Sequence, residues 1–269
     1  MNGALYWFMM KTGWKSLLGY TGGAILLVAS FVALFPTMAD SNQLDQLIQQ
    51  YPPALQEAFG LSLGMDTLVT FLAVEHYSLM FLLVLGAYVI FTSNRLMAKL
   101  VDRGSMAYIL ATPVSRTKIA ITQALVLLSG VLVIIAATVG AAFLSSIIFA
   151  PDSEFGSVAG FWRLNFIGLL LFFAVSGYCF LFSSLFGDER KMLAFSSGLT
   201  LLFYGLDMMG KITEDVEWLR DFTIFSLFDS SKLIESRDDL AVNTIILGAV
   251  ALVTFGLAVL VFRKKSLSL

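Results

Sequence analysis

The sequence predicts an all-α integral membrane protein with about six transmembrane helices. Of its 269 residues, 58% are hydrophobic and 13% are charged, whereas a soluble domain has roughly 45–50% apolar and about 25% charged residues. Six apolar runs are long enough to cross the hydrocarbon core, which takes about 20 helical residues. Lipid offers the backbone no hydrogen-bond partners, so we expect each of these runs to be a helix.

The six runs belong to one expected transmembrane domain that covers residues 1–269. They lie at about 17–35, 68–92, 119–149, 161–186, 192–209 and 241–262. The first run follows two lysines, as the apolar part of a signal peptide would. It is long, however, and no A-x-A cleavage site follows it, so we expect it to be retained as a span.

The charged residues predict how these spans are oriented. Six spans place both termini on the same side as the loops at 93–118 and 187–191, and this side holds twelve of the seventeen Lys and Arg residues. The opposite loops, at 36–67, 150–160 and 210–240, hold fourteen of the nineteen acidic residues. Short loops rich in Lys and Arg stay in the cytoplasm. Both termini are therefore predicted to be cytoplasmic.

Several classes of function are excluded by what the sequence contains. A single cysteine, Cys179, and a single histidine, His76, provide neither a disulfide nor a Cys/His metal site within one chain. The chain has no G-x-x-x-x-G-K-[ST] loop for nucleotide phosphates and no G-x-S-x-G or H-E-x-x-H motif. We therefore predict no enzymatic activity, no metal and no cofactor on this chain. Because orientation already explains the basic loops, we expect no nucleic-acid partner.

The segment before the first span is predicted to form a short interfacial helix. Residues 3–15, GALYWFMMKTGWK, combine four aromatic rings with two lysines. Such side chains favour the headgroup region of a bilayer.

The outer segments are also expected to be helical. Leu44, Leu47 and Ile48 have helical spacing and predict an amphipathic helix on the outer surface. Residues 210–240 combine eight acidic residues with aromatic and aliphatic ones. This composition by itself predicts that residues 210–240 form an amphipathic surface loop between spans five and six.

The cytoplasmic loop between spans two and three contains the most informative local pattern. Gly104 can end the helix that continues from span two, and Ser105 can cap a short new helix. Pro113 disfavours helix at the residue before it, and Ser115 can cap the helix that enters span three.

The new helix, at 106–111, is apolar apart from the Tyr108 hydroxyl although it lies in a cytoplasmic loop. It must therefore either pack on its own bundle or fill a groove on a partner protein.

The run from Asp102 to Arg116, DRGSMAYILATPVSR, resembles the segment after span two in ABC-2-type permeases, the membrane subunits of ATP-binding-cassette exporters. That family shows an acid two residues before a Gly-Thr or Gly-Ser pair, followed by Leu-Leu-x-x-Pro-Val/Ile-Ser-Arg. Its members also share the aromatic N-terminus, the six spans and the extended outer segment. Two departures are Asp102, where Glu is commoner, and Gln123, where Lys is frequent.

The resemblance implies that residues 105–111 form a coupling helix, which docks on a separate ATPase subunit that holds ATP and Mg. The residues implied to make this contact are Asp102, Arg103, Gly104, Ser105, Met106, Tyr108, Ile109, Leu110, Pro113 and Arg116. It further implies a second permease, either another copy or a paralogue, in a bacterial cytoplasmic membrane. Residues 210–240 would gate the exit path. The implied cargo is a small hydrophobic compound or an amphipathic, antimicrobial-type peptide.

Three ionisable residues are candidates for the substrate pathway, namely Glu75, His76 and Asp207. If span two begins near residue 68, Glu75 lies about 10 Å inside the membrane, where ionisable groups are usually functional. If the membrane begins nearer residue 73, Glu75 and His76 lie at the interface instead. A Glu75→Gln variant separates the two readings, because only the first expects transport to be lost.

Two alternatives to ATP-driven export remain open. One is a binding protein that senses or sequesters a toxic peptide without turnover, as immunity proteins do. The other is a secondary transporter with Glu75 and Asp207 as proton sites. Copurification of an ATPase and ATP-dependent efflux would distinguish the permease from both.

Overall fold

The computed structural model describes residues 1–39, 51–52, 55–56, 61, 64–236 and 239–265. These residues form helices and no strand, and six of the helices are long and apolar enough to cross a membrane. The predicted all-α fold is therefore confirmed. The six membrane-length helices run over Gly3–Met38, Leu68–Asp102, Arg116–Phe149, Val158–Leu185, Glu189–Ile212 and Leu240–Lys264.

The first of these helices, α1 (Gly3–Ala39), differs from the prediction at its start. The segment expected to form a separate interfacial helix is the first part of α1, and no break divides it from the first span. No proline precedes Pro36 in this helix, and the intervening glycines lower helix propensity without preventing the backbone from continuing. Lys11 and Lys15 lie exposed on the continuous helix.

The second membrane-length helix is built from five consecutive pieces. They are α4 (Leu68–Leu72), η2 (Ala73–Met80), α5 (Phe81–Ser93), η3 (Asn94–Ala98) and α6 (Lys99–Asp102). The pieces η2 and η3 are π-helical, a wider winding that is rare in proteins and frequent at functional sites. Glu75 and His76 both lie in η2.

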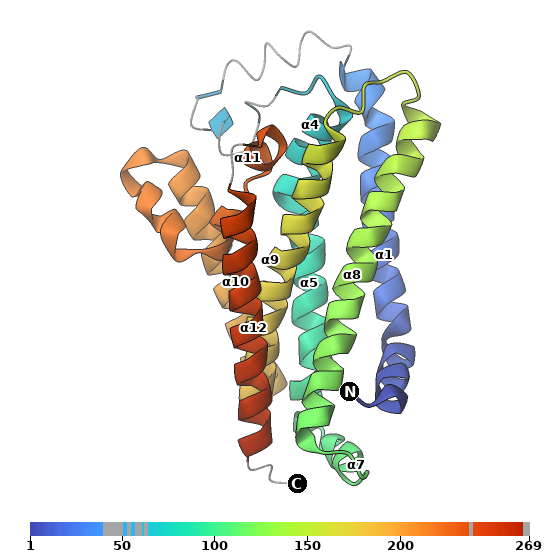
Figure 1. The fold of residues 1–269 in the computed structure, drawn as a ribbon, viewed down its shortest axis with the longest axis vertical. Coiled ribbons are helices and arrows are strands. Elements are labelled where there is room, and N and C mark those ends of the chain that lie inside the picture. Colours follow the sequence, from blue (N-terminus) through green and yellow to red (C-terminus); the bar gives the residue numbers. More distant parts are fainter. Residues whose placement is uncertain (40–50, 53–54, 57–60, 62–63, 237–238, 266–269) are drawn as a thin grey trace.

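The remaining spans are α8 (Arg116–Phe149), α9 (Val158–Leu185), α10 (Glu189–Ile212) and α12 (Leu240–Lys264). In Figure 1 α1 and α8 lie on one side of the bundle, and α10 and α12 lie on the other. Most of α9 is buried, and it contacts α5, α8, α10 and α12. Since only a minority of the span residues of α1, α10 and α12 are buried, against most of those of α9, the bundle is packed around α9.

The two ends of the bundle carry different short helices. The short helix α7 (Met106–Leu110) lies at the lower end in Figure 1, together with the start of α1 and the end of α12. The charge imbalance predicts that this end faces the cytoplasm. At the outer half, η4 (Glu214–Phe222) and η5 (Ile224–Leu227) project beside α10, and α11 (Ser230–Glu235) contacts α9. The amphipathic helix predicted around Leu44, Leu47 and Ile48 lies outside the described residues.

A glycine near the start of α9 permits the close approach of α11. A Cβ at Gly160 would lie 3.0 Å from the carbonyl oxygen of Ile234 and 3.1 Å from its Cα. Both are backbone atoms, so that Gly160→Ala must displace α11. We expect this variant to be destabilised, because overpacking costs about 1–3 kcal/mol and outweighs the gain of up to about 1 kcal/mol from the helix propensity of alanine.

The matched control is Gly248→Ala on α12, where an added Cβ meets nothing within 4 Å. This variant should be neutral or more stable. The melting temperature in detergent should therefore fall for Gly160→Ala and stay unchanged or rise for Gly248→Ala, and equal shifts would contradict the packing argument.

Candidate functional site

The turn before α7 is set by a glycine, as the sequence predicts. Gly104 has a φ of 69°, a conformation that strains residues with a Cβ, and its N–H donates to the Val101 carbonyl at 3.0 Å. The expected cap at Ser105 is wrong, because its hydroxyl makes no capping hydrogen bond and its backbone is already helical. Ser115 does cap α8, accepting from the Lys118 N–H at 3.4 Å.

The side chains of α7 divide between the protein interior and its surface. Met106 is fully buried, whereas Tyr108 is 82% exposed. Ile109 and Leu110 are partly buried against the core. The helix therefore packs on its own bundle through one face and presents an exposed aromatic ring through the other.

The polar residues that precede α7 are held by the first residue of α10. The Glu189 carboxylate accepts from the Asn94 amide at 2.9 Å and lies 3.4 Å from the Lys99 Nζ and 3.9 Å from Arg103. In return Asp102 accepts from the backbone N–H of Glu189 at 3.4 Å. This clamp joins the end of the second span to α10.

A second set of contacts joins the residues that follow α7 to the end of α12. The Arg116 guanidinium donates to the Lys265 carbonyl. The Lys265 Nζ donates to the carbonyls of Ser184 and Leu185, both at 3.0 Å. These carbonyls end α9 and lack partners within that helix. Partial burial lowers the pKa of Lys265.

An apolar groove of about 520 Å³ lies between α1 and the α7 turn. One wall is formed by Asn2, Ala4, Leu5 and Phe8, and the other by five residues between Tyr108 and Val114. The N-terminal wall is fixed to α8, because the Asn2 N–H donates to the Thr122 hydroxyl at 2.9 Å. We call this surface the cytoplasmic groove.

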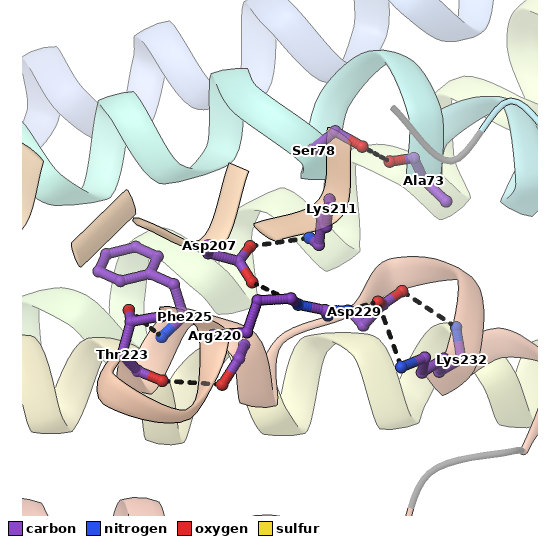
Figure 2. A network of polar contacts seen from close by, with 10 residues as sticks. Ala73, Ser78, Asp207, Lys211, Arg220, Thr223, Phe225, Asp229 and Lys232 are labelled. Atoms are coloured by element: carbon purple, nitrogen blue, oxygen red, sulfur yellow. Dashed lines mark hydrogen bonds and ion pairs between the residues drawn. The ribbon is translucent and has the colours of Figure 1, made fainter. Parts of the chain in front are cut away.

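At the outer half of the bundle, charged side chains form a buried network (Figure 2). Asp207 of α10 lies 2.8 Å from the Lys211 Nζ and 3.2 Å from the Arg220 Nε. Arg220, on η4, also reaches Asp229 at 3.2 Å. The side chains of Asp207, Arg220 and Asp229 are 5%, 14% and 14% exposed. We call these residues, together with Lys232, the outer ion-pair network.

The network ties η4 to α10 and α11. Asp229 also caps α11, accepting from the Lys232 N–H at 3.3 Å. Gly210 lets η4 lie against α10, since a Cβ there would lie 2.5 Å from the Arg220 Cγ. The outer segment is therefore held against the bundle by buried charge pairs. Its aromatic residues add a contact with span two, where the rings of Phe81 and Phe228 stack with their centroids 5.9 Å apart.

A small cavity lies between this network and the π-helical turn of span two. Its volume of about 20 Å³ suits about one water molecule. Its lining includes Tyr77 and Ser78 of η2 together with Asp207, Lys211 and Asp229. The π-helix and the outer ion-pair network therefore meet at one polar site inside the bundle.

The three predicted pathway residues are not brought together. Asp207 lines the cavity, while Glu75 and His76 are not among the residues that line it. Glu75 is exposed on the surface of η2. His76 is buried among Phe31, Tyr77 and Phe81, and neither ring nitrogen has a hydrogen-bond partner among the described residues.

The sequence did not single out Glu189, Arg220 and Asp229, which the structure places in the clamp and in the outer ion-pair network. Within the outer ion-pair network, a signal was present only for the pair of Asp207 and Lys211, which stand four residues apart at the end of a predicted span and can pair along one helix face. Arg220 and Asp229 lie in a segment rich in charge, where no sequence feature singles out a buried pair.

Residues 4–263 match a family model described as the C-terminal domain of the multidrug efflux system permease Rv1217c. The matched range includes all of α7, the cytoplasmic groove from Ala4 onward, and the outer ion-pair network. No curated protein matches the chain.

Proposed function

Because this chain belongs to the family of the multidrug efflux permease Rv1217c C-terminal domain, we propose that it is the permease subunit of an ABC-2-type exporter. It forms the substrate pathway, together with a second copy or a paralogue. The ATP and Mg are bound by a separate ATPase subunit. A transport subunit of this kind needs no catalytic residue of its own.

The observation that carries the proposal is the exposed face of α7. Tyr108 is 82% exposed on α7, at the end of the bundle where α1 begins and α12 ends. An aromatic side chain presented to the cytoplasm on a helix that is otherwise anchored by Met106 is suited to insertion into a partner. Docking of the ATPase on α7 would couple ATP-driven movement to the bundle through the clamp at Glu189.

The outer segment is the proposed exit gate. Its η4 and η5 helices lie beside α10, and the outer ion-pair network holds them there. Release of these pairs would open the outer half of the pathway. The name of the family supports a cargo of small hydrophobic compounds. An amphipathic peptide would present an apolar face of similar character to the pathway.

The test is a mild-detergent purification of the tagged chain from its native membranes, with a photo-crosslinking residue in place of Tyr108. We expect mass spectrometry to identify an ABC ATPase crosslinked at this position. A crosslinker at Trp218, which is 58% exposed on η4, is the control and should capture no ATPase. If position 108 yields no ATPase while the protein remains folded, the proposal is wrong and a transporter or binding protein independent of ATP takes its place.

A further inference from the structure

We propose that a groove between α9 and α10 binds a phospholipid with an anionic headgroup, taken from the cytoplasmic leaflet of the membrane. The groove is apolar and has a volume of about 390 Å³. It is lined by Phe182, Ala194, Phe195, Gly198, Leu199 and Leu202. We call this surface the lipid groove. The inference goes beyond the proposed function and needs no ATPase, because it rests on the membrane-facing surface of the chain.

The lipid groove matches one leaflet in position and length. The part of α10 that lines it, from Ala194 to Leu202, rises about 12 Å along the helix axis. Half of the hydrocarbon core is about 15 Å thick. The helix begins at Glu189, which belongs to the clamp at the predicted cytoplasmic end. Since Phe195 and Leu202 are each 55% exposed, the described chain leaves the groove open to an acyl chain of this leaflet.

Two cations stand at the cytoplasmic end of the lipid groove. Arg190 and Lys191 are exposed, and neither forms an ion pair with any residue that the structure describes. Arg190 lies four residues before Ala194, and Lys191 lies four residues before Phe195. Residues four apart are neighbours on one face of a helix. Both cations therefore stand one turn from the groove and on its side of α10.

The acidic residues beside these cations are engaged elsewhere. Asp188 caps α10, accepting from the backbone N–H of Lys191 at 2.8 Å. Glu189 is held in the clamp, and Asp102 accepts from its backbone N–H. The side-chain charges of Arg190 and Lys191 are thus left for a group outside the chain. Basic pockets beside membrane helices on the cytoplasmic side bind the headgroups of anionic lipids.

The same two charges select an anionic lipid over a zwitterionic one. Both kinds of headgroup contain a phosphate, but the ammonium of a zwitterionic headgroup is repelled by nearby cations. Each Lys or Arg near the membrane surface favours anionic lipid about fivefold. Two such residues acting together should therefore favour it about 25-fold.

The experiment places a fluorophore in the lipid groove. The sole native thiol, Cys179, is fully buried, so that bimane reacts only with an introduced Gly198→Cys. Gly198 lines the groove, and a Cβ there meets nothing within 4 Å. In nanodiscs of phosphatidylcholine, phosphatidylglycerol with brominated chains should reach half-maximal quenching at about 4 mol%. Brominated phosphatidylcholine should need about 50 mol%, as a preference of about 25-fold in exchange requires.

Two double variants test the role of the cations. Arg190→Gln with Lys191→Gln should move the half-maximal point of brominated phosphatidylglycerol to about 50 mol%. The matched control is Arg263→Gln with Lys264→Gln at the cytoplasmic end of α12, where two exposed cations are removed away from the groove. This control should leave the half-maximal point at about 4 mol%. All four side chains are exposed, so neither double variant should change the melting temperature.

Three results would overturn the proposal. Equal quenching of the parent chain by the two lipids would show that the groove holds ordinary boundary lipid. An equal loss of preference in both double variants would show a general effect of surface charge. Absence of quenching by either lipid would show that protein, such as a second copy of this chain, covers the groove. None of these measurements involves the ATPase, so capture at Tyr108 tests the proposed function separately.

Discussion

An Arg220→Ala variant is expected to lose about 3 kcal/mol or more of its free energy of unfolding, because removal of one partner leaves buried carboxylates without compensation. Arg220 is the residue that joins Asp207 to Asp229, and all three are largely buried. The outer segment should also separate from α10. Unfolding titrations in mixed micelles would measure the first effect, and limited proteolysis between residues 214 and 227 would measure the second.

Two variants calibrate this result. Lys232 is 45% exposed and lies 4.0 Å from Asp229, so Lys232→Ala should cost less than about 1 kcal/mol. Arg220→Lys keeps the charge but loses the forked guanidinium that reaches two carboxylates, and should give an intermediate loss. If Arg220→Ala were no more harmful than Lys232→Ala, the network would not hold the outer segment.

The second large effect concerns Tyr108. We expect Tyr108→Asp to weaken ATPase association about 30-fold or more and to abolish drug efflux, since loss of a central aromatic anchor typically costs at least about 2 kcal/mol. Because the side chain is 82% exposed, the melting temperature of the isolated permease should not change.

Tyr108→Phe retains the ring and should keep nearly full efflux. Trp218→Asp places the same charge at an exposed aromatic position on η4 and should leave ATPase association intact. Normal efflux by Tyr108→Asp at normal expression would rule out α7 as the docking helix.

The spans and the cytoplasmic turn could be predicted because their signals are local. Helix ends set by Gly104 and Ser115 follow from backbone conformation and a nearby hydroxyl, which a few residues determine. Ser105 shows the limit of such rules. Ser105, directly after Gly104, already has helical dihedral angles, and its hydroxyl makes no capping hydrogen bond.

The candidate site was harder to predict from the sequence, because it depends on contacts between distant segments. The carboxylate of Glu189 meets Asn94 and Lys99, which lie about 90 residues earlier in the chain. The pairing of Asp207 with Arg220 depends on η4 folding back along α10. No periodicity or composition specifies such a return, because an acidic segment is equally compatible with a solvated loop.

The helix α10 carries the clamp at Glu189 at one end and Asp207 of the outer ion-pair network near the other. It is 24 residues long, about 36 Å, and a helix of this length resists compression along its axis far more than it resists sliding past its neighbours. A displacement applied at the cytoplasmic end therefore reaches the outer ion pairs as a translation of the whole rod. Force applied on one side of the bilayer can in this way loosen contacts on the other without any helix unwinding between them.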